Sequence, residues 1–253
     1  GLGYNFTNQR QTWIQRILIT LMRIGFNGTN TSVIFQNQDD FVLIQKLKIT
    51  TSTNNIYFIK GSGVDLSKFK QMELRDNSKI QILFPARMLK DKGIEDLKEA
   101  SKILKARFYN KIIFILAGFI DKENKAGVST EFIREWEEDN YVRWIGHQEN
   151  MIEVYTNSDI VVLPSYREGM PKSLIEACAI GRPIVTTNAP GCKECVDEGI
   201  NGLKVPIRSP KELANAIEKL IISKELRIEM GKASRKKAEE EFCLNQVIKK
   251  HLT

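Results

Sequence analysis

Two cations and two carboxylates stand at positions from which they could bind a charged ligand that also carries hydroxyl groups. Arg87 and Lys92 lie five residues apart in ARMLKDKG (86–93), directly after an apolar segment. Two such cations can converge on one diphosphate, because a guanidinium binds oxygens in bidentate fashion and an ammonium acts as a point charge. The alternative is a pair of solvated loop cations, which the same spacing allows.

The carboxylates are Glu168 and Glu176, eight residues apart in EGMPKSLIEACAIG (168–181). Pro171 and Gly181 are typical of the start and end of a helix, so Glu168 is expected in the preceding loop and Glu176 inside the helix. We expect Glu168 to accept hydrogen bonds from sugar hydroxyls and Glu176 from the vicinal hydroxyls of a ribose. The alternatives are an exposed helical glutamate at 176 and, at 168, a charge that stabilises the helix dipole.

Motifs of several common enzyme classes are absent from the chain. There is no GxxxxGK[ST], no GxGxxG between a strand and a helix, no GxSxG and no Asp-x-Asp, and the two histidines are His147 and His251. This disfavours P-loop NTPases, NAD enzymes, hydrolases with a catalytic triad, histidine-rich zinc sites and a carboxylate-held metal–diphosphate. Cys192 and Cys195 form a single CxxC, for which we favour small packing side chains over zinc or redox chemistry.

From about residue 80, apolar segments alternate with helical patterns. The segments predicted as parallel strands, buried on both faces, are 80–86, 111–118, 141–146, 159–165 and 182–187. The predicted helices are 93–108, 130–139, 150–158, 172–181 and 210–242. The alternation predicts an α/β fold with a doubly wound parallel sheet, and right-handed crossovers would bring the charged loops to one edge of it.

The first 65 residues contain too few elements to close a sheet of their own. The patterns predict helices at 12–26 and 39–48 and strands at 32–37 and 55–63, which we interpret as the tail of one α/β domain joined by a polar linker to a complete second one. Helix 12–26 carries arginines beside apolar residues, so it could lie on an anionic membrane or pack on its own sheet.

The composition indicates a folded chain with acidic partners. Hydrophobic residues make up 42% and charged residues 27% of the 253 residues, and the net charge is +7. That balance favours phosphates, nucleic acid or anionic lipid, but the scattered lysines argue against a nucleic-acid partner. No apolar run reaches the roughly 18 residues of a membrane-spanning helix and no signal-peptide pattern is present, so we expect a cytoplasmic location.

A series of motifs gives a more specific comparison. In chain order they are GSGVDLSKF (61–69), PARMLKDKG (85–93), LAG (116–118), IGHQENMIEVYTNSDIVVLPSYREGMPKSLIEACAIGRPIV (145–185) and PGCKECVDEGINGLKVP (190–206). With them, the chain resembles the donor-binding half of retaining GT-B glycosyltransferases of family 4, the group 1 type. IFQNQDDF (34–41) is similar to the end of their acceptor-binding domain. The resemblance is to bacterial members that build capsule, lipopolysaccharide or lipid-linked glycans.

The resemblance implies a metal-independent hexosyl- or N-acetylhexosaminyltransferase with a Rossmann-like donor domain and no cofactor. Its donor substrate would be a nucleotide sugar, UDP-linked, and Arg87, Lys92 and Glu168 would form the catalytic set. The two cations would stabilise the leaving diphosphate, Glu168 would hold the transferred sugar, and Glu176 the ribose. Further donor contacts would come from the backbone beside the base at Ile145 and from Gly169, Met170, Pro171, Lys172 and Ser173.

The resemblance also implies an acceptor and a domain plan. The acceptor would be a lipid-linked or cell-surface polysaccharide, with peripheral contact to the inner membrane and no role for nucleic acid. The glycine-rich loop and the histidine of the family's acceptor domain have no counterpart here, so most of that domain is expected to be missing. The expected parts are 1–65 (acceptor-domain tail), 66–79 (linker), 80–235 (donor domain) and 236–253 (a helix crossing back). The alternative is a catalytically incomplete nucleotide-sugar-binding fragment from a truncated or split gene.

Overall fold

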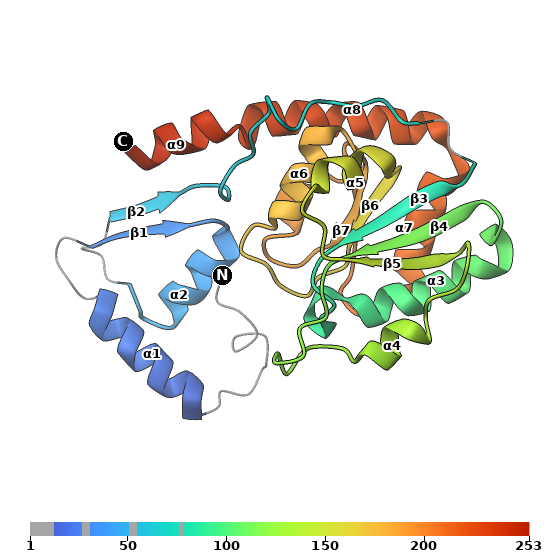
Figure 1. Cartoon of the computed structure of the whole chain (residues 1–253). Helices are drawn as coiled ribbons and strands as arrows, with labels where there is room; N and C mark the ends of the chain where they lie inside the picture. Colours follow the sequence, from blue (N-terminus) through green and yellow to red (C-terminus); the bar gives the residue numbers. More distant parts are fainter. Residues whose placement is uncertain (1–12, 27–30, 51–54, 76–77, 253) are drawn as a thin grey trace.

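The computed structural model describes residues 13–26, 31–50, 55–75 and 78–252, which form two units (Figure 1). In the first, β1 (Ser32–Phe35) pairs in parallel with β2 (Asn55–Phe58). The second contains a six-stranded sheet in the order β5-β4-β3-β6-β7-β8. Its strands are β3 (Ile80–Pro85), β4 (Ile112–Ala117), β5 (Val142–Gly146), β6 (Ile160–Leu163), β7 (Ile184–Thr187) and β8 (Gly202–Val205). The predicted α/β fold with a parallel sheet is confirmed.

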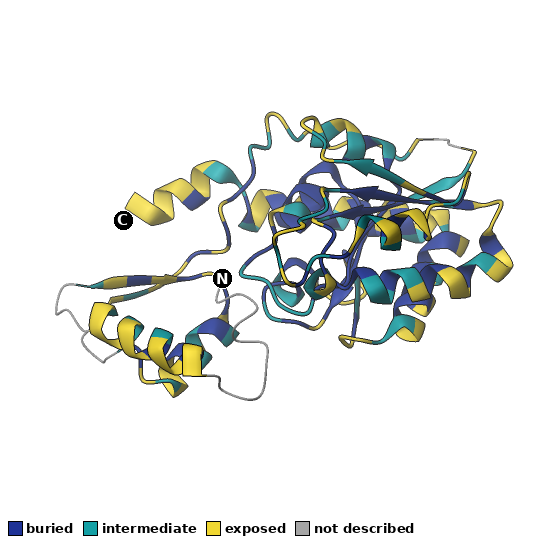
Figure 2. Cartoon of the chain, turned by 60° about the horizontal axis from the view of Figure 1, so that its bottom comes forward, coloured by how far each residue is buried: buried dark blue, intermediate teal, exposed yellow. Residues whose placement is uncertain are grey.

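Helices cover both faces of the six-stranded sheet. On one side α3 (Ile94–Phe108) packs against α7 (Pro210–Ile222), and on the other α6 (Lys172–Ile180) packs against α8 (Lys224–Glu241) and α5 (Met151–Asn157). The central strands are therefore buried on both faces, and Figure 2 shows them mostly dark blue between helices that carry blue, teal and yellow residues. Burial on both faces is why the strands are nearly continuous apolar runs.

The strand order creates a switch point between β3 and β6. From β3 the chain moves outward to β4 and β5, then returns to β6 on the opposite side of β3 and continues to β7 and β8. Because the crossovers are right-handed, the loops after β3 and β6 leave toward opposite faces of the sheet. In open α/β sheets this is where ligands bind, at the carboxyl ends of the strands.

The first unit has a small apolar core of its own. It comprises α1 (Trp13–Phe26), α2 (Gln38–Lys46) and the two strands, with buried Ile19, Val33, Phe35, Ile44 and Ile49. Thus α1 packs on its own sheet through one narrow stripe, while Trp13 and other apolar residues on its remaining surface stay exposed (Figure 2). No helix within the described ranges is long and apolar enough to cross a membrane.

The C-terminal segment corrects two predicted helices. The expected helix 210–242 is two helices, because Ser223 ends α7 and its hydroxyl caps α8 by accepting from the Leu226 amide at 3.1 Å. The expected single helix 236–253 is also wrong. Helix α8 continues past residue 236, and the helix is interrupted at 242–243 before α9 (Leu244–Leu252) begins. At the break, Val64 donates to the Phe242 carbonyl (2.8 Å) and accepts from the Leu244 amide (3.0 Å), which replaces helical hydrogen bonds.

Two further elements differ from the predicted pattern. Strand β8 was not expected, because GLKV begins with glycine and contains a lysine instead of forming an apolar run. Helix α4 (Thr130–Arg134) is shorter than the predicted 130–139. The stretch 66–79 has no helix or strand over its described residues, but it is attached to the second unit, since the Arg182 guanidinium donates to the Met72 carbonyl at 2.6 Å.

One glycine allows the two loops at the switch point to approach each other closely. A short 3-10 helix, η2 (Lys90–Lys92), ends at Gly93, which has φ +72°. A Cβ atom at Gly93 would lie 2.1 Å from the carbonyl oxygen of Pro164, at the end of β6. The loop after β3 can therefore approach the loop after β6 this closely only with glycine at position 93.

We predict that Gly93→Ala lowers the free energy of unfolding by about 2–5 kcal/mol, because the left-handed backbone and the collision with Pro164 both oppose it. The matched control is Gly199→Ala, at φ +74° with no atom within 4 Å of the added Cβ. This control should lose only about 1–2 kcal/mol, the backbone cost alone. Urea unfolding of both variants measures the difference, and equal losses would show that the close approach has no energetic consequence.

Candidate functional site

A salt bridge connects the two loops at the switch point. Lys92, at the end of η2, places Nζ 2.5 Å from Oε1 of Glu168 in the loop after β6. The two side chains are mostly buried, with 17% and 13% of their surfaces exposed. A pair so shielded from water is much less weakened by salt than a surface pair. The structure therefore brings together one predicted phosphate-binding cation and one predicted sugar-binding carboxylate.

Arg87 also has a carboxylate partner, which the sequence analysis did not identify. It lies just beyond β3, and its Nη1 is 2.9 Å from Oδ2 of Asp121, which follows β4. Arg87 remains exposed, so its guanidinium is accessible to a ligand as well as to Asp121. The position of Asp121, shortly after the predicted strand at 111–118, was the signal that could have suggested this pair.

The backbone around Glu168 is held by neighbouring loops. Its amide donates to the Pro190 carbonyl at 2.9 Å, and the Tyr166 amide donates to the Asp91 carbonyl at 2.9 Å. Gly191, with φ +81°, would place a Cβ atom 2.5 Å from the Glu168 carbonyl oxygen, so the loop after β7 packs directly against this segment. The Glu168 loop is thus fixed by the loops that follow β3 and β7.

The segment from Gly169 to Ser173 leads into α6, and Pro171 is its N-cap. Met170 and Pro171 are buried and Lys172 is exposed, while the Ser173 carbonyl accepts from the Tyr155 hydroxyl at 3.0 Å. The first hydrogen bonds within the helix run from Leu174 and Ile175 to the Pro171 carbonyl. The amides of 172 and 173 precede them, where helices attract anionic oxygens.

Glu176 is buried in α6, with about 9% of the residue exposed. The alternative of an exposed helical glutamate is therefore wrong. Burial raises the pKa of Glu176, while the nearby positive charge of Lys172 opposes the shift. The Lys172 ammonium lies 3.6 Å from its Oε1. A carboxylate kept here against its desolvation cost is well suited to accepting hydrogen bonds from a ligand.

Ile145 lies near the end of β5 and does not join these ionic groups through any described contact. Its carbonyl accepts from Nε2 of Gln148 at 2.5 Å. Its side chain helps to line a hollow of about 380 Å³ beside α5, together with Arg143 and Asn150. Its proposed place beside the base stays a prediction.

The CxxC pair is part of the packing under the site. Cys192 and Cys195 are fully buried, and burial raises the pKa of the Cys192 thiol to about 12, so it stays protonated at neutral pH. The Cys195 sulfur contacts the Met170 sulfur at 3.4 Å. Within the described ranges, no group of three or more His, Cys, Asp or Glu residues could hold a metal ion. The described geometry favours packing over the zinc or redox alternative.

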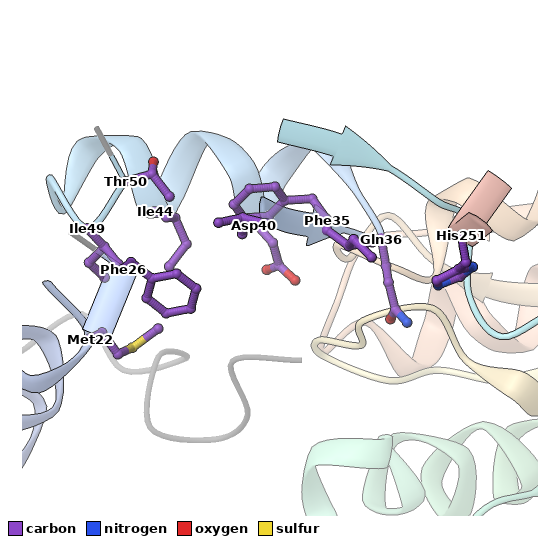
Figure 3. A pocket seen from close by; sticks show the side chains of 11 residues that line it. Met22, Phe26, Phe35, Gln36, Asp40, Ile44, Ile49, Thr50 and His251 are labelled. Carbon is purple, nitrogen blue, oxygen red and sulfur yellow. The ribbon is translucent and has the colours of Figure 1, made fainter. Parts of the chain in front are cut away.

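A separate hollow of about 410 Å³ lies in the first unit (Figure 3). Apolar side chains including Met22 and Phe26 line one end, and Gln36 and His251 lie at the other. His251 belongs to α9, so the last helix does return to the first unit. Asp40 lies between the two ends of the hollow, and its Oδ1 pairs with Nη2 of Arg167, next to Glu168. The sequence analysis did not identify Asp40 or Arg167.

Comparison with known proteins identifies relatives that match most of this chain, across both units. The chain is 30% identical to the N,N'-diacetylbacillosaminyl-diphospho-undecaprenol alpha-1,3-N-acetylgalactosaminyltransferase of Campylobacter jejuni, covering 92% of this chain and 62% of the relative. It is 29% identical to the capsular polysaccharide biosynthesis glycosyltransferase CapM of Staphylococcus aureus, covering 88% of this chain and 60% of CapM. The chain thus spans about three fifths of the length of these relatives.

Solved structures agree on the fold. HepE of Anabaena, solved in complex with UDP, superposes with a TM-score of 0.79 at 19% identity, over 92% of this chain and 66% of HepE. At that identity the likeness concerns the fold alone. The family described as Glycosyl transferases group 1 matches residues 45–237, which include β2, the six-stranded sheet and both charged loops. The chain belongs to the glycosyl transferases group 1 family.

Proposed function

We propose that the chain is a metal-independent, retaining glycosyltransferase of family 4, or the donor-binding part of one, that uses a UDP-linked hexose or N-acetylhexosamine. The observation that carries this proposal is the Lys92–Glu168 salt bridge at the switch point of the sheet, with Arg87 on the same sheet edge and Glu176 in the following helix. Cations and hydroxyl acceptors then gather around one switch point of the sheet, as a nucleoside diphosphate sugar requires.

The proposed chemistry depends on electrostatic stabilisation of the leaving group. The bond between the anomeric carbon and the phosphate oxygen breaks, a bond from that carbon to the acceptor oxygen forms on the same face, and the acceptor's proton passes to the departing phosphate. Arg87 and Lys92 stabilise the charge that develops on the diphosphate, the role a metal ion has in other transferases. Preorganised charges of this kind are commonly the largest single contribution to catalysis.

The salt bridge supports distinct roles for its two partners. Lys92 already lies against Glu168, so one ammonium can contact both the carboxylate that orients the sugar and an oxygen of the diphosphate. An ammonium has three donors and can serve both acceptors at once. Glu168 is therefore held beside the bond that breaks, while Glu176, eight residues along the chain, is available for the ribose at the other end of the donor.

The proposed acceptor is a lipid-linked or cell-surface polysaccharide at the cytoplasmic face of a bacterial membrane. The support comes from the two relatives, one named for a diphospho-undecaprenol acceptor and the other for capsular polysaccharide. Exposed apolar residues of α1 beside Arg16, together with the net charge of +7, are compatible with peripheral contact to an anionic lipid surface.

A second candidate is a fragment that binds the donor without transferring the sugar. It is favoured by the observation that the proposed donor contacts Arg87, Lys92, Glu168 and Glu176 all lie in the second unit. Incubation with UDP-N-acetylhexosamines and a polyprenyl-diphosphate glycan separates the two candidates. Labelled sugar appearing on the lipid with the donor's anomeric configuration supports transfer with retention. Binding without labelled product supports the second candidate, and absence of both contradicts the proposed function.

We predict that Glu176→Ala weakens binding of UDP and of a UDP-sugar by about ten- to a hundredfold each, because both ligands contain the ribose. Glu168→Gln should weaken only the UDP-sugar. The matched control is Glu99→Ala, which removes an exposed carboxylate paired with Lys102 on α3. Calorimetric titration measures all three variants. Unchanged UDP affinity in Glu176→Ala would remove the ribose assignment.

Glu176 should also make stability depend on pH. Because its pKa in the folded chain is raised above the ordinary 4.5, its contribution to stability is present below that pH and is lost as the pH rises through the folded value. We therefore compare the free energy of unfolding of the unaltered chain with that of Glu176→Gln. The difference in favour of the unaltered chain should decrease as the pH rises, and the variant should be at least as stable at pH 7. Urea unfolding between about pH 4 and 8 tests this. A pH-independent difference would contradict it.

A further inference from the structure

Two contacts from the first unit reach the residues on either side of Glu168. The side-chain amide of Asn37 donates from Nδ2 to the Gly169 carbonyl at 2.8 Å. The Arg167 guanidinium donates to Oδ1 of Asp40. These partners are 132 and 127 positions apart in the chain, and both come from the N-terminal turn of α2. Glu168 itself therefore lies between two residues that the first unit holds.

The contacting groups are buried and fixed to one another. Asn37 is 3% and Asp40 6% exposed. Asn37 caps α2, because its Oδ1 accepts from the Asp40 amide at 2.8 Å, and its Nδ2 also donates to Oδ2 of Asp40 at 3.1 Å. The Arg167 side chain is 15% exposed. Loss of Asp40 would leave this guanidinium mostly buried without its carboxylate, which is strongly unfavourable.

The second unit by itself supports this loop from other directions. Pro190 and Asp91 accept from backbone amides of the loop, and Gly191 packs against the Glu168 carbonyl. Gly191 also packs against the Gly169 carbonyl, but none of these contacts involves the Arg167 side chain and none of the hydrogen bonds involves the Gly169 carbonyl. Their described hydrogen bonds and ion pairs run to α2, so the position of Glu168 depends on both units.

We propose that Asn37, Asp40 and Arg167 are positioning residues that orient Glu168 for the sugar of the donor. The inference rests on the proposed role of Glu168 and makes sugar binding in the second unit dependent on α2 of the first. UDP contains no transferred sugar, so its affinity should not require this orientation. The gain in affinity of a UDP-sugar over UDP should require this orientation of Glu168.

The test compares Asp40→Asn with a matched control, Asp39→Asn. Asp39 stands in the same first turn of α2 and also pairs across the units, with Lys193 at 2.6 Å, but 38% of each side chain is exposed and neither residue adjoins Glu168. Both variants remove one acidic charge from the same helix end. They differ in whether the lost pair contacts a neighbour of Glu168.

Two measurements are made on both variants and on the unaltered chain. Amide hydrogen exchange of the 166–170 segment should become at least about tenfold faster in Asp40→Asn, because a lost buried charge pair opens the loop, and should stay unchanged in Asp39→Asn. Calorimetry should show unchanged UDP affinity in both. The affinity gain of a UDP-sugar over UDP should fall about tenfold in Asp40→Asn alone. The UDP-sugar is whichever of UDP-glucose, UDP-galactose and their N-acetylamino forms the unaltered chain binds most tightly.

Each outcome decides the matter. Unchanged exchange in Asp40→Asn, or an equal loss of UDP and UDP-sugar affinity, overturns the inference, since the second result is what simple destabilisation would give. Arg167→Gln removes the pair from the other side and should reproduce the effect, and the double variant should add nothing to it. If the unaltered chain binds no UDP-sugar more tightly than UDP, the proposed role of Glu168 fails in the unaltered protein itself.

Discussion

The salt bridge between Lys92 and Glu168 is the contact on which the rest of the site depends. It joins loops from two adjacent strands that send their chains to opposite faces of the sheet. Such loops diverge unless something holds them together. Gly93 allows the close approach by leaving room for the Pro164 carbonyl, and the salt bridge then places a cation and a carboxylate side by side in a mostly buried position.

Under the proposed function, this arrangement would let fixed protein charges take the place of mobile counter-ions around a diphosphate. Arg87 and Lys92 each already have a carboxylate partner, Asp121 and Glu168. A bound anion would therefore enter a site whose cations are oriented beforehand, and orientation paid for during folding is not paid again when the ligand binds. Burial in α6 raises the pKa of Glu176, so the charged form of this carboxylate is held there at a cost in stability.

The two units meet where the donor sugar is proposed to lie. Asn37 and Asp40 reach the neighbours of Glu168, and α9 returns from the second unit to the hollow of the first, beside Gln36 (Figure 3). The two units are thus in contact both through α2, near the start of the described chain, and through α9, at its end. A change in the position of the first unit would therefore move the neighbours of Glu168, which couples the first unit to the loops at the switch point.

The sequence by itself determined the parallel sheet, the edge that carries the charged loops, and the candidates Arg87, Lys92, Glu168 and Glu176. These follow from local patterns: apolar runs, helix punctuation and charges just after strands. Strand β8 was not predicted because its four residues form no such run. The interruption of the helix at 242–243 was not predicted because it depends on hydrogen bonds with Val64. Only the tertiary structure decided that Lys92 meets Glu168, that Arg87 meets Asp121, and that Asn37 and Asp40 hold the loop. Partners 34 to 132 positions apart are chosen by how the packed elements meet, and local sequence does not encode that geometry.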